Sequence, residues 1–237
     1  LSGTGLSLSV PVLDVHVGQN SRLKHCVIQN LGEETWQVSK QNFQLEKDSY
    51  VEMFTAAFGG DYARSEIRCD LKGRGSEAYS AATYFGNGEQ TLDFRTFQKH
   101  EAPDTTSKLL FKGALDEDSR SIYSGLIKVL PEAIRTKAQQ TNRNIKLSEN
   151  AWAESVPNLE IETNDVVCSH ASTVSGIDEE QLFYLESKGV ETSVAERLII
   201  AGFFDGVISK VFDPLVVEEA TSILSNVLQH RSESEDK

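Results

Sequence analysis

The sequence predicts a mainly β protein, in which a β-solenoid is followed by a small C-terminal α-helical domain. Two observations carry this prediction. A short turn-like pattern recurs through the first three quarters of the chain, with short segments of alternating apolar and polar residues between its copies. Helix start signals occur only from Asp178 onward. We therefore expect a β-helix core domain over residues 1–177, a helical domain over 178–230 and a disordered tail over 231–237.

The recurring pattern is an apolar residue, then three polar or small residues often ending in Asn or Asp, then Ser or Ala. Its copies begin at Val17, Leu45, Leu115 and Leu147, with a looser copy at Leu71. Asn, Asp and Gly tolerate left-handed backbone, so each copy predicts a turn that ends one strand and begins the next. The starts are 28, 26, 44 and 32 residues apart, in the range of solenoid coils with occasional insertions.

The segments between the turns are short and alternate in polarity, as in residues 13–17, 36–38, 43–45 and 92–97. Alternation places one side of a strand in a core and the other in water. A β-sandwich would also fit these strands, but the recurring turn favours a solenoid. The coils at the ends of a solenoid expose unpaired strand edges, which need a cap or a partner. The amide side chains in this region are expected to form buried polar ladders without a catalytic role: Gln139, Gln140, Asn142 and Asn144.

Three helices are expected in the last quarter of the chain. Asp178 is the predicted N-cap of the first helix, Gln181 completes its capping box, and Gly189 is the predicted stop. Ser193 is the predicted cap of the second helix, and Pro214 begins the third. Apolar residues lie on more than one face of the second helix, which indicates burial or contact with another protein. We expect the helices to dock on the solenoid end or on a partner.

The composition limits the possible partners. The chain has 237 residues, with 23 Lys and Arg against 36 Asp and Glu, giving a net charge of −13. Because an acidic surface repels nucleic acid phosphates and anionic lipid headgroups, we expect neither nucleic acid nor membrane as a direct partner. Three cysteines without a CxxC pair suit a reducing compartment, so we expect a cytoplasmic protein. The absence of a starting Met leads us to expect a fragment of a longer protein.

Cys168 and His170 are the candidate metal ligands. They lie two residues apart in the last strand-like segment before the helices, so they point to the same face, about 7 Å apart. Thiolate and imidazole are ligands that iron and zinc prefer. The alternative is that both side chains only fill a core. Two ligands cannot close a metal site, so another chain or a distant segment would have to complete it.

Motifs for a self-sufficient enzyme are missing from the sequence. It contains no phosphate-binding loop of the GxxxxGK[ST] type and no nucleophile elbow. Glu160 and Glu162 share a strand face, which is weak support for a β-helix carbohydrate-active enzyme, the alternative reading. The remaining histidines, His100 among them, are expected to be structural or solvated. A non-catalytic scaffold is therefore the favoured interpretation.

Several segments closely resemble the SufB/SufD family, the scaffold proteins of SUF iron–sulfur cluster assembly. The most specific is residues 164–173, Asn-Asp-Val-Val-Cys-Ser-His-Ala-Ser-Thr, followed by residues 177–185 and 188–189. Residues 140–144 and 157–161 fit the same family. The resemblance covers nearly the whole chain. It implies a right-handed parallel β-helix followed by a small helical domain.

Two departures favour the SufD branch of this family over the SufB branch. SufB typically has Glu on both sides of the family histidine, where this chain has Ser169 and Ala171. SufB also carries an essential cysteine at about the position of Asn142, where this chain has no thiol. A SufB-type subunit is the alternative within the family.

The resemblance implies a SufB–SufD heterodimer joined through the β-helix ends, with the ATPase SufC bound to each C-terminal helical domain. It also implies a transient iron–sulfur cluster at that interface, to which the family histidine, His170 here, contributes with Cys168 beside it. No cluster is expected to stay on the isolated chain, which could form a homodimer through its free edge. The second helix and its neighbour are expected to form the SufC surface.

Overall fold

The computed structural model describes residues 5–235, which form β-strands followed by three α-helices. The strands are β1 (Ser7–Ser9), β2 (Val12–Val17), β3 (Arg22–Gln29), β4 (Thr35–Leu45), β5 (Tyr50–Ala57), β6 (Tyr62–Leu71), β7 (Glu77–Gly86), β8 (Thr91–His100), β9 (Thr106–Leu115), β10 (Arg120–Val129), β11 (Thr136–Lys146), β12 (Trp152–Ile161) and β13 (Val166–Ser175). The helices are α1 (Glu179–Ser187), α2 (Thr192–Ile208) and α3 (Pro214–Glu235).

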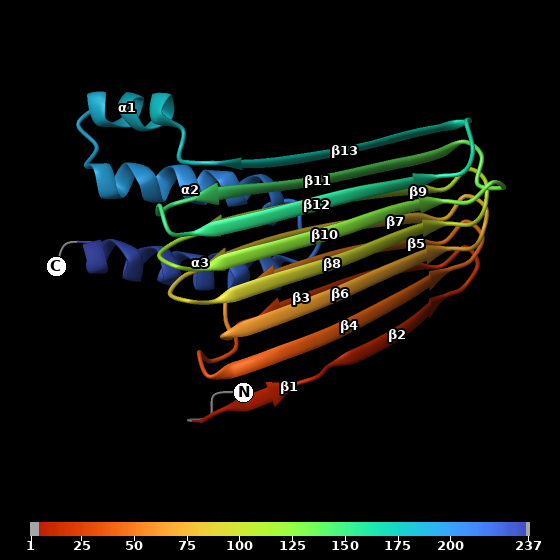
Figure 1. The fold of residues 1–237 in the computed structure, drawn as a ribbon, viewed down its shortest axis with the longest axis horizontal. Helices are drawn as coiled ribbons and strands as arrows, with labels where there is room; N and C mark the ends of the chain where they lie inside the picture. Colours follow the sequence, from red (N-terminus) through yellow and green to blue (C-terminus); the bar gives the residue numbers. More distant parts are fainter. Residues whose placement is uncertain (1–4, 236–237) are drawn as a thin grey trace.

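The strands form two facing parallel sheets (Figure 1). One has seven strands in the order β1-β4-β6-β8-β10-β12, with β2 also paired to β4, and the other has six in the order β13-β11-β9-β7-β5-β3. From β2 onward the chain passes from one sheet to the other after every strand, and each strand pairs in parallel with the strand two positions along the chain. This arrangement is a solenoid, as predicted. The alternative, a β-sandwich, is built from antiparallel strands, whereas the strands here pair in parallel.

The corners between coils explain the uneven spacing of the turn pattern. Asn20, Asp48 and Gly75 lie at one corner and have left-handed backbone, with φ of 57°, 54° and 72°, as the pattern predicts. The copies that begin at Leu115 and Leu147 lie at the opposite corner, where the chain returns to the seven-stranded sheet. The longest spacing is therefore a change of corner, and the expectation of an insertion there is wrong.

Other corner residues adopt left-handed backbone without a signal in the pattern. In the copy that begins at Leu115, the pattern places the turn residue at Asp118, but the left-handed residue is Glu117, with φ of 52°. Asp104 and Arg135 have φ of 62° and 60°. Arg135 donates hydrogen bonds of 2.6 and 2.9 Å to the two carboxylate oxygens of Asp104. Arg74 pairs with the same carboxylate at 2.8 Å. The guanidinium of Arg135 and then that of Arg74 hold the pKa of Asp104 below its usual value, and these pairs connect successive turns.

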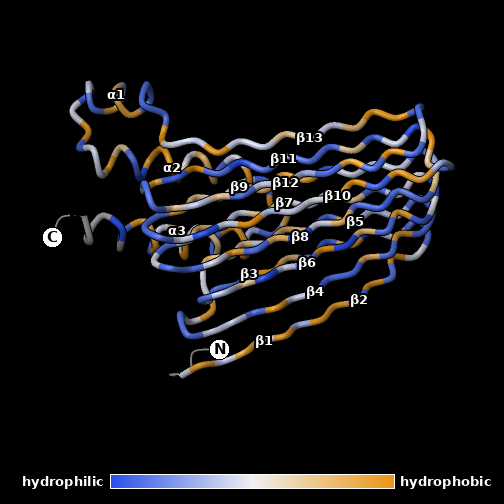
Figure 2. The backbone as a smooth tube through the Cα atoms, viewed as in Figure 1, coloured by the Kyte–Doolittle hydropathy of each residue, from blue (hydrophilic) through white to orange (hydrophobic). Residues whose placement is uncertain are grey.

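Aromatic rings from the two sheets pack in a row inside the solenoid. Tyr84 contacts Phe94 with ring centroids 4.8 Å apart, and Phe94 contacts Phe111 at 5.5 Å. Tyr123 continues the row at 5.6 Å from Phe111. All four side chains are at most 2% exposed. Because alternate residues of a strand face inward, hydrophobic and hydrophilic residues are interspersed along the strands (Figure 2).

A buried polar cluster crosses three strands beside this row. The Tyr84 hydroxyl donates to Asn144 Oδ1 at 2.6 Å and accepts from Asn142 Nδ2 at 3.0 Å. Gly113 lies between Tyr84 and Asn144 in register, and a Cβ at this position would collide with the Tyr84 ring. The prediction of buried amides is confirmed for residues 140, 142 and 144, whereas Gln139 is exposed on the outer face.

The first helix begins as predicted and the second does not. Asp178 Oδ1 accepts from the backbone N–H groups of Glu180 and Gln181 at 3.0 and 3.1 Å, and Gly189 has φ of 84°. The N-cap of α2 is Glu191, without a side-chain capping bond, so the prediction of Ser193 is wrong. Helical backbone begins at Thr192, so Ser193 lies within the first turn of α2.

The helices pack on the side of the solenoid. Apolar residues on the outer face of the six-stranded sheet, including Phe54 and Phe85, form one buried cluster with Ile200 and Phe204 of α2 and Ala220 of α3. The expectation that the helices dock on the solenoid end is wrong, because this sheet face is itself apolar and buries them; their docking on a partner stays a prediction. None of the helices within residues 5–235 is long and apolar enough to cross a membrane.

The third helix is longer than the sequence indicates. It runs to Glu235 and includes residues 231–235 of the expected disordered tail, so that expectation is wrong there; residues 236–237 lie outside the described part. Arg231 explains the extension. Its guanidinium pairs with Asp116 at 2.6 Å and Glu196 at 2.7 Å, which fastens α3 to the solenoid and to α2.

Candidate functional site

The last coil of the solenoid is open. β12 forms one edge of the seven-stranded sheet and β13 one edge of the six-stranded sheet, and in the described chain neither has a partner on its outer side. Neither strand contains a fully buried residue. Large apolar side chains are exposed along this coil: Trp152 45%, Val156 41%, Ile161 40%, Val167 71% and Val174 43%. Unpaired edges with apolar side chains are a typical pairing surface.

Cys168 and His170 lie on the same side of β13. They are in register with Ala138 and Gln140 of β11, two buried residues that face the interior. Cys168 is half-buried and packs against the small apolar cluster of the last coils that includes Ala138. Burial raises the pKa of its thiol. His170 faces the same way but is exposed, because no further coil covers it.

Gln140, directly next to His170 in register, is a feature that the sequence did not reveal. Its side chain is completely buried, yet neither Oε1 nor Nε2 has a hydrogen-bond partner among the described residues. The exposed imidazole of His170 on β13 thus lies, in register, next to the fully buried Gln140 of β11.

This chain does not assemble a complete metal site by itself. Within residues 5–235, no three His, Cys, Asp or Glu side chains lie close enough to hold a metal ion. The other two cysteines lie elsewhere: Cys69 is buried beside Met53, and Cys26 is half-buried. Burial raises their pKa values to about 12 and about 11. Any ligand site on the last coil would therefore need donors from another chain.

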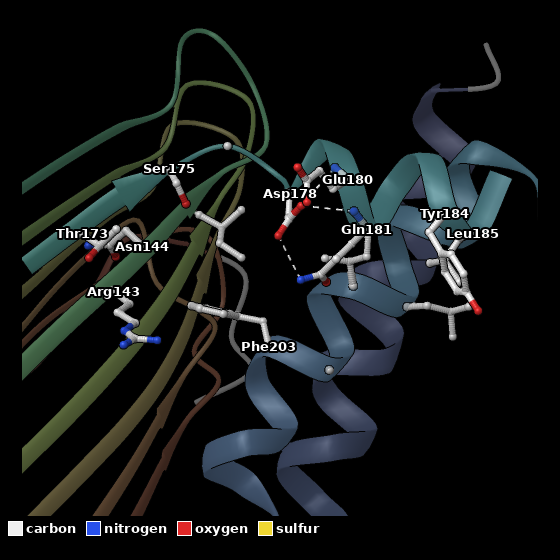
Figure 3. A pocket seen from close by; sticks show the side chains of 15 residues that line it. Arg143, Asn144, Thr173, Ser175, Asp178, Glu180, Gln181, Tyr184, Leu185 and Phe203 are labelled. Atoms are coloured by element: carbon white, nitrogen blue, oxygen red, sulfur yellow. Dashed lines mark hydrogen bonds between the residues drawn. The ribbon is translucent and has the colours of Figure 1, made fainter. Parts of the chain in front are cut away.

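A cavity of about 990 Å³ lies between the end of β13 and the first two helices (Figure 3). In Figure 3, Arg143 and Thr173 lie on the strand side, with Gln181 and Leu185 on the helix side. Large apolar side chains are exposed at and around this groove: Phe183 71%, Tyr184 61% and Leu198 52%. The groove thus combines an apolar helical rim with a polar strand side.

The residues that could indicate carbohydrate chemistry are engaged in structural contacts. Glu160 and Glu162 both pair with Lys128, at 3.0 and 3.5 Å. His100 is buried, with its ring nitrogens 2.8 Å from Thr105 Oγ1 and 2.9 Å from Ser107 Oγ. Burial lowers the pKa of His100 to about 4. Of the two roles expected for this histidine, structural or solvated, the structure shows the structural one.

A parallel solenoid with an open last coil and helices on one sheet face defines the class of the protein. A family model described as the SufBD core domain of SUF system FeS cluster assembly matches residues 2–203. The chain therefore belongs to the SufB/SufD family, as the sequence motifs indicated.

Individual relatives agree with this assignment. A SufBD family protein of Mycobacterium tuberculosis is 34% identical over 221 residues, covering 90% of this chain and 56% of that protein. The iron–sulfur cluster assembly protein SufD of Escherichia coli is 30% identical over 189 residues, covering 80% and 45%. SufD of Bacillus subtilis is 29% identical over 221 residues, covering 93% and 50%. The chain spans about half the length of the curated relatives it matches.

Proposed function

We propose that this chain is a SufD-type scaffold subunit that pairs with SufB through its open last coil. The observation that carries the proposal is the combination of two unpaired strand edges with exposed apolar side chains on β12 and β13. Residues 170, 172 and 174 face the interior side of β13 but have no coil above them. A partner coil stacked there would cover these positions and satisfy the edges.

Val174→Asp tests this pairing. A carboxylate at this exposed site would leave the isolated fold intact but would be buried without a partner on pairing, so binding of SufB should weaken at least tenfold. Light scattering of the chain with and without SufB measures the heterodimer, and also any homodimer of the isolated chain. Val38→Asp, on the outer face of β4 away from the last coil, is the matched control. Unchanged pairing of Val174→Asp would reject this surface.

The proposed cargo of the paired coils is a transient iron–sulfur cluster. His170 is the proposed ligand or proton-handling group of this chain, because it is exposed at the edge, whereas the thiol of Cys168 is half-buried in packing. Histidine in place of thiolate raises the potential of a cluster. Donors from SufB would complete the site. Cys168→Ala should therefore affect cluster formation less than His170→Ala.

The proposed SufC surface is the apolar rim of α1 and α2 around the groove. A truncation after Gly176 would be a poor test, because it would uncover the apolar sheet face that α2 and α3 bury. Leu198→Asp changes one exposed residue instead, and we expect it to weaken SufC binding while circular dichroism remains unchanged. Val12→Asp on β2, at a similarly exposed position, is the control. Equal SufC affinity for both variants would show that the apolar rim of α1 and α2 is not the SufC surface.

A non-catalytic role in the cytoplasm is part of the proposal. Two findings argue against a carbohydrate-active enzyme. Glu160 and Glu162 are paired with Lys128, and the chain belongs to the SufB/SufD family. Against a SufB-type subunit stands Asn142, which is hydrogen-bonded within the buried polar cluster. The three free thiols suit a reducing compartment. Turnover of acidic polysaccharides would overturn the scaffold role.

A further inference from the structure

A second cavity lies on the outer face of the six-stranded sheet, beneath the end of α2. Its volume is about 560 Å³, within the range of small-molecule sites. β5, β7, β9 and β11 form the floor, and residues between 206 and 212 form one wall. Tyr79, Leu110 and Phe212 give the cavity an apolar portion. The cavity is distinct from the last coil, because β13 contributes no lining residue.

Four basic side chains converge on this cavity from three parts of the chain. They are Lys108 and Lys112 on β9, Arg143 on β11 and Lys210 just after α2. In the part of the chain that the structure describes, none of the four has a carboxylate within ion-pair distance. Such a grouping is unexpected on a chain with a net charge of −13.

Nearby acids do not neutralise this group. Glu52 lines the cavity but is paired with Lys24 at 3.7 Å. Asp205 is the acid that acts electrostatically on Lys112, and it is opposed by Arg143 and Lys210. Holding these four positive charges close together costs free energy when no anion lies between them. An anion in the cavity would offset that cost.

Contacts with Phe203 hold the Lys112 side chain in place at the cavity. Its ammonium donates to the Phe203 carbonyl at 2.6 Å and lies 4.6 Å from the centroid of the Phe203 ring. Gly206 permits this position, since a Cβ there would lie 3.1 Å from Lys112 Nζ. Burial and the charges of Arg143 and Lys210 lower the pKa of Lys112. The Lys112 ammonium therefore adds fixed positive charge to the cavity wall.

We propose that this cavity binds the phosphate groups of a small phosphorylated molecule, with Arg143, Lys108 and Lys210 contacting phosphate oxygens. Guanidinium matches phosphate geometry with two parallel hydrogen bonds, and lysine adds point charge. Several cations suit the multiple charges of a diphosphate better than the single charge of a carboxylate. Tyr79 and Phe212 would contact the apolar portion of the ligand.

Calorimetric titration of the full chain with pyrophosphate and with adenosine diphosphate, at physiological ionic strength, tests the proposal. We expect saturable binding of both at one site and none of adenosine. Arg143→Gln and Lys210→Gln should each weaken binding about tenfold, the effect of losing one charged hydrogen bond. Arg120→Gln removes the same charge from the opposite sheet, where Arg120 is exposed, and should change affinity less than twofold.

Three results would overturn the proposal. Absence of saturable pyrophosphate binding would exclude a phosphate site. An equal loss in Arg120→Gln would show that binding follows net charge alone. Binding of polyglutamate that depends on Arg143, without binding of pyrophosphate, would assign the cavity to an acidic protein segment instead.

Discussion

The inner coils and the last coil of the solenoid share one backbone geometry but differ in what covers them. Strands β6 and β10 alternate between buried and partly or fully exposed residues along their whole length. β12 and β13 continue the same parallel ladders yet bury no residue fully. The difference comes only from neighbours, because an inner strand has one on each side and a last strand does not. The burial of the last coil therefore depends on a partner, as does that of the first coil, where Leu8 and Val12 are 64% and 63% exposed.

Replacing one side chain in each region should give the largest contrast in stability. Phe111→Ala removes a completely buried ring from the aromatic row and should lower the free energy of unfolding by about 4 kcal/mol. Val167→Ala, at a side chain 71% exposed on β13, should change it by less than about 0.5 kcal/mol. Urea unfolding of the isolated chain measures both. A large loss for Val167→Ala would mean that the outer face of β13 is covered, for example by a second copy.

The buried His100 makes the stability of the solenoid interior depend on pH. Its pKa is about 4 in the folded chain against an ordinary histidine value of about 6.5, so between these pH values the unfolded chain binds more protons. This contribution to stability is complete above pH about 6.5 and declines as the pH falls toward about 4, by up to about 3 kcal/mol. Urea midpoints from pH 4 to pH 7 measure the effect. A His100→Asn variant should show a flatter profile, and an identical slope would exclude His100 as the cause.

Replacing two glycines, one inside the solenoid and one in a helix, should change stability in opposite directions. Gly113→Ala places a methyl group against the buried Tyr84 ring and should cost about 2 kcal/mol by overpacking. Gly202→Ala in α2 meets nothing within 4 Å and should stabilise the helix by about 0.5–1 kcal/mol. Thermal melting of both variants checks the signs. A neutral Gly113→Ala would show that Tyr84 has room to move.

Local chemistry made the solenoid and the first helix predictable. Asn20 and Asp48 signal turns by their own backbone preferences, and Asp178 caps α1 with its own carboxylate. The two corners share one turn chemistry, so the sequence could not separate them. The docking of the helices depends on outward apolar residues such as Phe54 and Phe85, which local periodicity does not distinguish from core.

The candidate site was predictable only in part. Alternation along the strand correctly placed Cys168 and His170 on one side of β13. The exposure of His170 depends on which coil is last, which local patterning does not reveal. The cationic cavity brings together Lys108, Arg143 and Lys210, which are far apart in sequence, so only the folded chain reveals it.

The most direct test of the scaffold account is cluster reconstitution by the assembled complex of this chain with SufB and SufC. Visible absorbance measures the cluster that forms, with light scattering as the control for intact assembly. We expect His170→Ala to assemble normally but to form no cluster, with Cys168→Ala losing less. A normal cluster yield from the assembled His170→Ala complex would contradict the account and remove His170 from the site.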